Sequence, residues 1–399
     1  MILSIKTQEN IAGLLLGSVL LLITFLKVHW FLTSYDWVTS LYPLSIILGF
    51  FLVFFFGAKL VRIKGLYGFI TLIVIEIFLY TILHISSQNQ QKVFTKLPWQ
   101  NIFYNGTANI MQYDPKLSEF DEALGYRYKR SVASTFSNLE FDTKITTNSL
   151  GLRDDEKSLN KPRIIALGDS YTTGWGVEDN ERFSEILEEK SGLKVLNAGI
   201  SSFGTVREGL LLNELDLDSC KMVIIQYCMN DYLENKTWLD ELKNGKTFKP
   251  SFNKEKYNLR VKTNVALSSY TPFKYIHRYT LTILRRLFSK NFTLPKVTNS
   301  DIPEHVSLFI QGLKQIRNNY KNNILVISLS NSYNRLDPAF TNELNLQLEI
   351  SGLSGIDILE TSHLFKKNDI FYLDTHLNAN GHAKLAEHLF KYLKDNPLK

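Results

Sequence analysis

The chain has 399 residues, a formal net charge of +6 at pH 7 and two cysteines. This length exceeds that of a typical single domain, so the composition has to be read segment by segment. Cys220 and Cys228 flank one apolar run, which as an extended strand would hold them over about 20 Å apart, and this excludes a disulfide between them. Such sparing use of cysteine suits a bacterial extracytoplasmic domain that does not rely on disulfides.

Residues 1–90 are strongly apolar and are predicted to form a membrane anchor. Three runs are each long enough, with their flanks, to cross about 30 Å of hydrocarbon. These runs are Ile11 to Leu26, Leu41 to Phe56 and Leu66 to Ile85. A cleavable signal peptide is the alternative for the first run, but no small-residue cleavage site follows it and two more apolar runs do. The sequence therefore predicts three transmembrane helices.

The charges between these runs predict the orientation of the anchor. Lys59, Arg62 and Lys64 lie in the second connection, whereas the stretch TSYDW in the first holds an acid and no Lys or Arg. Positive charge collects in cytoplasmic loops. We therefore expect Met1 inside and everything after Ile85 outside, which describes a multi-pass protein of the inner or plasma membrane.

Residues 91–162 are predicted to contain a polar stalk, from about Ser87 to Pro98, and then short lead-in strands. Residues 163–399 alternate short apolar runs with amphipathic stretches. The predicted strands are Arg163 to Leu167, Lys194 to Leu196, Met222 to Tyr227, Ile324 to Leu329 and Ile356 to Leu359. The predicted helices are Glu181 to Lys190 with Asp179 or Asn180 as its cap, Thr205 to Leu215, Pro303 to Asn319, Pro338 to Ile350 and Ala379 to Lys394. This alternation predicts a three-layer α/β/α domain with a parallel sheet.

The first predicted strand runs into the stretch GDSYTTGWG. Ser170 lies in this glycine-flanked turn, just past the carboxyl end of the strand, where its hydroxyl can face a cleft. A serine nucleophile needs a base and an acid that orients the base. The C-terminal stretch DTHLNANGH offers Asp374 and His376 for these two tasks, although an acid two residues before a histidine is by itself usually a solvated pair.

Two further strands end on groups that can stabilise negative charge. The stretch NAG ends at Gly199, and MND supplies Asn230. Oxyanion stabilisation needs fixed donors, which backbone N–H groups at a glycine turn and an asparagine amide can provide. Each block alone could equally be ordinary turn chemistry.

Together, GDSYTTGWG, NAG, MND and DTHLNANGH resemble the SGNH or GDSL-type hydrolase family, over about Arg163 to the C-terminus. The preceding LGYRYKRSV…TTNSLGLRDDE is similar to the lead-in of a bacterial membrane-anchored branch, which extends the resemblance to about Leu117. The resemblance implies that Ser170 is the nucleophile, His376 the general base and Asp374 its orienting acid.

The resemblance also implies an oxyanion hole formed by the Gly199 N–H, the Ser170 N–H and the Asn230 side chain. Two positions depart from the family pattern. Cys228 stands where a glycine often precedes the Asn-Asp pair by two positions, and one residue instead of two separates Asp374 from its histidine.

No cofactor or metal is expected. His363, His382 and His388 are the histidines nearest His376, but their spacings put no two on one helical face and no cysteine joins them. The glycine stretch lacks the Lys-Ser/Thr ending of a phosphate-binding loop. Asp169 is expected to brace the turn around Ser170.

A basic insertion is predicted at about residues 235–300. The stretch from Tyr257 to Ser300 contains no Asp or Glu. It carries Arg260, Lys262, Lys274, Arg278, Arg285, Arg286, Lys290 and Lys296. Its core, FKYIHRYTLTILRRLFSK, has the mixture of bases and apolar residues of an interfacial helix, and an ordinary amphipathic helix with a solvated basic face fits equally well. The predicted location outside the cytoplasm argues against nucleic acid as a partner.

These features predict a membrane-anchored, extracytoplasmic serine esterase or O-acyltransferase. Its substrate would be an acyl ester of a cell-surface glycan, with acetyl as the leading choice. One alternative is a catalytically inactive glycan-binding or assembly subunit with a vestigial site. Another is a lipid esterase that the basic helix docks onto the bilayer. The three apolar helices could also bind a membrane partner protein.

Overall fold

The computed structural model describes residues 4–27, 30–31, 36–88, 104, 108–228, 230–243, 253–269, 271–288, 301–329, 338–361 and 363–398. The chain forms two compact units. The first combines Met1–Asn109 with Leu259–Phe292, and the second combines Ile110–Asn258 with Thr293–Lys399. The part of the predicted stalk that follows residue 88 lies outside the described residues.

The first unit contains the three apolar helices, α1 (Ile5–Leu26), α3 (Asp36–Leu60) and α4 (Gly65–Gln88). Each is long and apolar enough to cross a membrane, which confirms the three predicted spans as candidates. The side chain of Ser4 caps α1 by accepting the N–H of Thr7, and α1 packs along α3. All three helices therefore have the length and the apolar composition of membrane-spanning helices.

Part of the basic insertion belongs to the first unit. The insertion contains α10 (Lys254–Ser268) and α11 (Lys274–Phe288). Phe273 and Ile276, at the start of α11, are buried in one apolar cluster with Leu72 of α4. The carboxylate of Glu76, also on α4, accepts the N–H groups of Tyr275 and Ile276 at 3.0 and 2.9 Å. The first turn of α11 is thus fixed on α4 by apolar burial and by a carboxylate cap.

The core of the second unit is a five-stranded sheet in the order β6-β5-β7-β8-β9, and all its neighbouring strands are parallel. Its strands are β5 (Ile164–Gly168), β6 (Val195–Gly199), β7 (Met222–Tyr227), β8 (Asn323–Ser328) and β9 (Ile356–Leu359). All five overlap the predicted runs. Every residue of β5, β6 and β7 is buried, and this is why these strands lack polar alternation.

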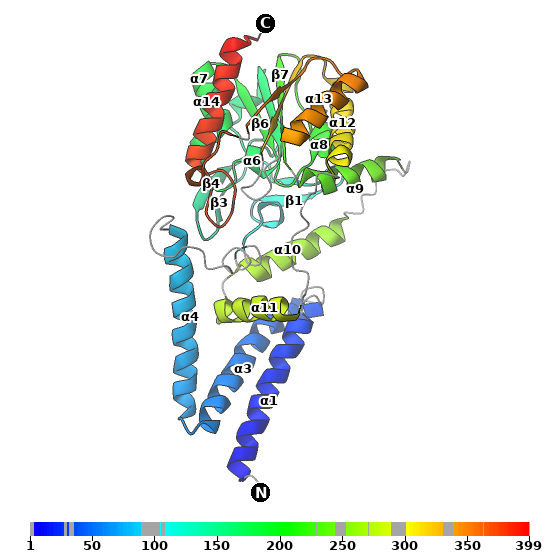
Figure 1. Ribbon diagram of the computed structural model, residues 1–399. Coiled ribbons are helices and arrows are strands. Elements are labelled where there is room, and N and C mark those ends of the chain that lie inside the picture. Colours follow the sequence, from blue (N-terminus) through cyan, green and yellow to red (C-terminus); the bar gives the residue numbers. More distant parts are fainter. Residues whose placement is uncertain are drawn as a thin grey trace. The chain divides into compact units, whose positions relative to one another are not determined.

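Helices cover both faces of this sheet, so the predicted three-layer α/β/α architecture is confirmed (Figure 1). One face carries α7 (Phe183–Ser191) and α14 (Ala379–Asp395). The other carries α8 (Thr205–Leu212), α12 (Ile302–Asn319) and α13 (Pro338–Ser351), with α9 (Asp231–Lys243) packed on α8 and α12. Aliphatic residues of α7 and α14 share one buried cluster with β5, β6, β7 and β8.

The predicted cap of α7 is wrong. Asp179–Glu181 forms a short 3₁₀ helix, and the residue that precedes α7 is Arg182. The Asp179 carboxylate is instead bound by the guanidinium of Arg153, with Nε and Oδ1 2.8 Å apart. A tertiary ion pair has therefore taken the side chain that local sequence assigned to a helix cap.

The lead-in segment contains the short strands that its alternating pattern predicted, and these strands pair into two antiparallel hairpins. The first pairs β1 (Ser118–Asp121) with β2 (Gly125–Tyr128), and the second pairs β3 (Ala133–Ser137) with β4 (Asp142–Thr146). In β4 buried and exposed residues alternate, whereas all of β2 is buried. The lead-in is therefore packed into the second unit over much of its length.

Candidate active site

The carboxyl ends of β5, β6 and β7 meet where the strand order of the sheet reverses, because β5 is flanked by the two strands that follow it in the chain. Open α/β sheets bind ligands at such a point. Ser170 follows β5, and Asn230 follows β7. Gly168 and Gly199 are register partners at the ends of β5 and β6. The topology thus brings three of the four sequence blocks to one edge of the sheet.

Ser170 begins a one-turn helix, α6 (Ser170–Thr173). The carboxylate of Asp169 caps this helix by accepting the Tyr171 N–H at 3.0 Å, so the predicted bracing role of Asp169 is confirmed. Gly174 ends the helix in the left-handed region, with φ of 84°, where a residue with a Cβ would be strained. The Ser170 N–H finds no acceptor within the described part of the chain.

The structure brings Ser170, His376 and Asp374 into hydrogen-bond contact. Ser170 Oγ lies 2.8 Å from His376 Nε2, across 206 residues of sequence. His376 Nδ1 contacts Oδ1 of Asp374. The Asp374 side chain is only 3% exposed, whereas the His376 side chain is 20% exposed. A buried acid behind a more accessible imidazole is the arrangement in which a histidine can accept a serine proton.

Two aromatic residues from the segment after β5 fix the imidazole. Trp175 donates its Nε1–H to Oδ2 of Asp374 at 2.9 Å. The Trp175 ring also stacks on the His376 ring, with centroids 5.0 Å apart and planes 15° apart, and the Tyr171 ring lies 4.8 Å from it. Both oxygens of Asp374 are therefore engaged, and the imidazole is held between rings.

Asp374 and His376 lie on a tight turn. The Phe371 N–H donates to the His376 carbonyl at 2.9 Å, and the Thr375 N–H donates to the Phe371 carbonyl at 3.3 Å. Thr375, the single residue between Asp374 and His376, has φ of 69°. A β-branched residue in this region is strained by about 1–3 kcal/mol. The strained turn is what lets two residues with one-residue spacing reach each other.

Glu140, at the tip of the β3–β4 hairpin, holds this turn in place. Its carboxylate accepts the N–H groups of Tyr372 at 2.8 Å, Leu373 at 2.7 Å and Asp374 at 2.8 Å. Each of these hydrogen bonds contributes about 0.5–1.5 kcal/mol, and about 1.5–3 kcal/mol when Glu140 is ionised, so together they offset the strain at Thr375. Burial raises the pKa of Glu140 to about 7, against the lowering effect of the three N–H groups.

Asn230 is held by the acid that precedes Ser170. Its Nδ2 donates to Oδ2 of Asp169 at 3.0 Å, and the thiol of Cys228 donates to the same oxygen at 3.1 Å. Burial raises the pKa of the Cys228 thiol well above its ordinary value, so the thiol stays protonated and can donate. Asn230 is exposed. Since an amide nitrogen carries two hydrogens, a second donor remains to face a ligand.

The N–H of Gly199 is already engaged, because it donates to Oδ1 of Asn197 at 3.0 Å. A Cβ on Gly199 would lie 2.4 Å from the Thr173 nitrogen, so this glycine allows β6 to pack against α6. Three residues further on, Ser202 has φ of 60°. Its N–H donates to no residue that the structure describes. The turn after β6 therefore offers Ser202, and not Gly199, as its free donor.

Ser202 was not among the residues predicted from the sequence. A serine rarely adopts a left-handed conformation, so nothing in the stretch NAGISSFG marks it. The lead-in segment supports it: Gln112 donates to Ser202 Oγ at 3.1 Å, and the Ser201 N–H donates to the Tyr128 hydroxyl at 2.8 Å. The Tyr126 hydroxyl donates to the Ser201 carbonyl at 2.8 Å.

Arg153, also in the lead-in, supports the segment after Ser170. Its fully buried guanidinium donates to the carbonyls of Thr173 at 3.3 Å and Val177 at 2.6 Å. Burial and the charge of Arg182 lower the pKa of Arg153 to about 10, which leaves it protonated at neutral pH. Lead-in residues thus contact the turns that carry Ser170, Ser202 and Asp374.

One group of potential metal ligands occurs within the described residues, formed by Asp169, Cys228 and Asp231. Its ligand atoms lie within 4.8 Å of one another. The Asp231 carboxylate accepts the Cys228 N–H at 3.0 Å, and the protonated thiol donates to Asp169. These contacts explain the group as a hydrogen-bond network beneath Asn230. His382 and His388 bond to the backbone, at Phe183 N–H and Glu360 carbonyl respectively.

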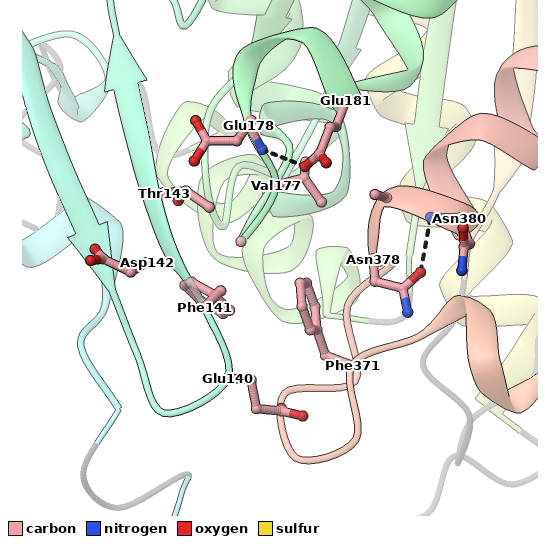
Figure 2. Close-up of a pocket in the computed structure, with 12 residues that line it drawn as sticks. Glu140, Phe141, Asp142, Thr143, Val177, Glu178, Glu181, Phe371, Asn378 and Asn380 are labelled. Atoms are coloured by element: carbon pink, nitrogen blue, oxygen red, sulfur yellow. Dashed lines mark hydrogen bonds between the residues drawn. The ribbon is translucent and has the colours of Figure 1, made fainter. Parts of the chain in front are cut away.

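A pocket of about 350 Å³ lies between the β3–β4 hairpin and the loop that carries Phe371 (Figure 2). It is lined by Glu140, Phe141, Asp142, Thr143, Gly176, Val177, Glu178, Glu181, Phe371, Asn378, Ala379 and Asn380. Ser170 and His376 are not in its lining, so this pocket is distinct from the cluster of Ser170, His376 and Asp374. Figure 2 shows Glu140 beside the loop that carries Phe371.

Comparison with protein-family models found no match, and comparison with curated proteins found no similar sequence. Solved structures similar to the chain include a G-D-S-L family protein from Desulfitobacterium hafniense DCB-2, described as lipolytic. This protein is 12% identical, with a TM-score of 0.33 over 58% of this chain and 99% of the other. The acetyl xylan esterase Est2A from Butyrivibrio proteoclasticus is 14% identical, with a TM-score of 0.35 over 59% of this chain.

A third similar structure is the salicylyl-acyltransferase SsfX3 from a tetracycline biosynthetic pathway. It is 13% identical, with a TM-score of 0.33 over 60% of this chain. The matched part spans 64% of the length of Est2A and 57% of the length of SsfX3. These structural neighbours are thus an esterase, an acyltransferase and a protein of the G-D-S-L family.

Proposed function

We propose that the chain is a membrane-anchored serine esterase or O-acyltransferase of the SGNH type that acts outside the cytoplasm. The observation that carries this proposal is the contact of Ser170 Oγ with His376 Nε2 at 2.8 Å, with Asp374 behind the imidazole. Nucleophile, base and orienting acid are the three parts that acyl transfer by a serine requires. The substrate is proposed to be an acyl ester, with acetyl as the leading choice, of a cell-surface glycan.

The first half of the reaction transfers the acyl group to the enzyme. His376 Nε2 takes the proton of Ser170 Oγ–H while Oγ forms a bond to the carbonyl carbon of the ester, and the carbonyl electron pair moves onto its oxygen. When this tetrahedral species collapses, the sugar oxygen leaves and takes the proton back from His376. Asp374 stays ionised and stabilises the imidazolium that forms in between.

The second half releases the acyl group. A water molecule or a hydroxyl of a second sugar gives its proton to His376 and attacks the acyl-serine, and the collapse returns that proton to Ser170 Oγ. Water yields a free carboxylic acid, whereas a sugar hydroxyl yields a new ester. The two activities therefore share all protein groups and differ only in the acceptor.

The oxyanion of both tetrahedral species needs donors that are fixed before the reaction. We assign this task to the N–H groups of Ser170 and Ser202 and to the second amide hydrogen of Asn230. All three lie at carboxyl ends of adjacent strands. The Ser202 N–H replaces the Gly199 N–H in this assignment, because the latter is bound to Asn197.

The proposed location outside the cytoplasm rests on the bases at the α3–α4 junction, which are Lys59 in the last turn of α3 and Arg62 and Lys64 in the connection. A glycan substrate is proposed because such esters are accessible to a domain anchored outside. The alternative of a vestigial binding module is weaker, since a retired site has no physical need for the contacts among Ser170, His376 and Asp374.

The test uses the full chain in detergent, a small activated acetyl ester and a serine-directed phosphonate. Wild-type protein should hydrolyse the ester and carry the label on Ser170. Ser170→Ala should abolish both, and His376→Ala should do nearly as much, because the two residues act as a unit. His363→Ala is the matched control, since His363 is exposed in the same region of the chain and should leave turnover unchanged.

Each outcome separates the candidate functions. Folded wild-type protein that neither hydrolyses the ester nor takes the label would favour the binding module. Labelling without hydrolysis would favour transfer to a specific acceptor over esterase action. Equal loss in His363→Ala and His376→Ala would show that the imidazole beside Ser170 is not the base.

A further inference from the structure

Glu140 is the lead-in residue that touches the base-carrying turn most directly. It stands at the tip of the β3–β4 hairpin, where the Asn138 N–H donates to the Phe141 carbonyl at 2.9 Å and closes the hairpin loop. The contact to the turn spans 232 to 234 residues of sequence. A residue outside the α/β core thus binds the segment that carries the proposed base.

The contact accounts for almost every N–H of the turn. Glu140 Oε1 accepts the Tyr372 N–H, and Oε2 accepts those of Leu373 and Asp374. The next N–H, of Thr375, donates to the Phe371 carbonyl. Three consecutive N–H groups that converge on one carboxylate form an anion-binding concavity. Without that carboxylate, the three groups would have no acceptor of the same geometry.

The clamped residue is the acid of the triad itself. The N–H of Asp374 donates to Glu140, while its side chain contacts His376 and accepts the Trp175 indole N–H at 2.9 Å. The backbone of Asp374 is therefore fixed from one side and its carboxylate from the other. Any shift of the turn would move Asp374 relative to Trp175 and move the imidazole relative to Ser170.

Aromatic packing holds the hairpin tip against the same turn. The rings of Phe141 and Phe371 lie 5.2 Å apart, and those of Phe136 and Trp175 lie 4.8 Å apart. Phe136 and Phe141 belong to the hairpin region, whereas Phe371 belongs to the turn. Because packing alone fixes distance but not the direction of the N–H groups, the carboxylate has a separate task.

We infer that Glu140 is a positioning residue for the proposed acyl-transfer reaction: its carboxylate orders the Tyr372–Asp374 backbone and so sets the geometry of Asp374 and His376 relative to Ser170. The inference rests on the function proposed above and assigns the β3–β4 hairpin a part in that site. It predicts that the hairpin contributes to kcat and not to the binding of a small ester.

The test compares Glu140→Gln with wild-type protein in the full chain. Glutamine keeps the volume of glutamate, but its side chain presents one oxygen and one NH₂, so a donor would face the backbone donors of the turn. Glu140→Asp keeps the charge and shortens the reach. Asp142→Asn is the matched control, because Asp142 lies on the same hairpin and its carboxylate bonds to Ser137 in that hairpin.

Two readouts are measured. Hydrogen–deuterium exchange of the peptide that covers residues 370–378 reports on the three clamped amides. It should speed up in Glu140→Gln and stay at the wild-type rate in Asp142→Asn. Ester hydrolysis should show kcat lowered roughly 10- to 100-fold in Glu140→Gln with KM nearly unchanged, since a misplacement of about 1 Å in a catalytic group costs on this scale. Glu140→Asp should lie between Glu140→Gln and the wild type.

The outcomes separate this inference from the proposed function. Unchanged exchange in Glu140→Gln overturns the clamp, whatever the activity does. Faster exchange with unchanged kcat overturns the positioning role, because the turn would then be free to move without consequence. Wild-type protein with no turnover and no phosphonate label overturns the proposed function and, with it, the catalytic half of this inference.

Discussion

Gly199 and Ser202 divide two tasks within one turn. Gly199 supplies the space in which β6 approaches α6, since a Cβ there would meet the backbone of Thr172 and Thr173 at 2.7 and 2.4 Å. Asn197 completes the joint by donating to the Thr172 carbonyl at 2.7 Å and accepting the Gly199 N–H. In the proposed assignment, the Ser202 N–H is a donor to the oxyanion. The glycine is thus explained by packing and the serine by chemistry.

Gly199→Ala should therefore lower the free energy of unfolding of the chain, and not only its rate of ester hydrolysis. The added methyl would overlap backbone, which cannot move aside as a flexible side chain could, so we expect a loss of about 1–3 kcal/mol. The loss should appear as a lower Tm of the full chain together with weaker phosphonate labelling, because α6 carries Ser170. Ser202→Ala, which keeps the backbone N–H, should retain kcat within a few-fold.

A Gly199→Ala chain with the wild-type Tm would contradict the packing role. If that chain also lost turnover, the Gly199 N–H would have to be assigned as an oxyanion donor again. The comparison uses the same protein preparations and the same ester assay for both variants, so the two roles are distinguished without knowledge of the natural substrate.

At the scale of elements, the α/β core could be predicted closely from the sequence, whereas the supports of its site could not. Buried strands such as β7 read as continuous apolar runs, and serine, aspartate and histidine blocks mark their own positions. Glu140 and Arg153 carry no such mark. Both contact backbone groups of other segments, Glu140 at Leu373 and Arg153 at Thr173, and a backbone donor or acceptor leaves no signal in the sequence.

The packing of α11 could likewise not be predicted from the sequence. Its residue pattern indicates an amphipathic helix but does not show which helices it contacts. Glu76 lies inside the apolar span of α4, where an isolated acid would be costly. The structure shows the compensation, since both carboxylate oxygens accept N–H groups of the first turn of α11. Aromatic contacts add to this joint: the Phe25 and His277 rings are 5.0 Å apart.

Glu76→Ala should loosen α11 from the apolar helices. The loss of a carboxylate cap costs about 0.5–2 kcal/mol, and Glu76→Gln should have a smaller effect because one oxygen remains. In lipid vesicles, trypsin should cleave the full chain after Arg278, which is 9% exposed, faster in Glu76→Ala than in wild type. Thr71→Ala is the control, because the Thr71 hydroxyl bonds within α4. Equal cleavage of all chains would mean that Glu76 does not fix α11.

At the scale of the whole molecule, the second unit holds a buried histidine that makes its stability depend on pH. His382 of α14 is 1% exposed, and its Nδ1 accepts the Phe183 N–H of α7 at 3.3 Å. Burial, followed by the charges of Arg153 and Arg182, lowers the pKa of His382 to about 3. In the folded chain His382 therefore stays neutral down to about pH 3. In the unfolded chain the same side chain becomes protonated below about pH 6.5.

Stability should consequently fall as the pH drops from about 6.5 toward 3, and by pH 5 the contribution of His382 amounts to about 2 kcal/mol. His382→Gln cannot take up the proton, so its Tm should fall less between pH 7 and pH 5 than the wild-type Tm. Glu140, whose pKa is raised to about 7, acts in the opposite direction but is common to both chains. The exposed His363→Gln should follow the wild type, and an equal acid sensitivity in His382→Gln would refute this account.

The orientation of the chain in the membrane is the property on which the proposed substrate depends most. If all three helices cross the membrane, the two ends of the anchor lie on opposite sides, and Lys59, Arg62 and Lys64 favour a cytoplasmic connection between α3 and α4. A reporter fused after Lys64 should be active as a cytoplasmic reporter, and one fused after Gln91 as an external reporter. Replacing the three bases by Gln should weaken this orientation preference, because their positive charge keeps the connection in the cytoplasm. Glu9→Gln is the control and should leave the preference unchanged, since acids contribute little to orientation. A reporter after Gln91 that is active only in the cytoplasm would place Ser170 inside the cell and remove the case for a surface glycan, while the hydrolysis and labelling tests of the triad would keep their meaning.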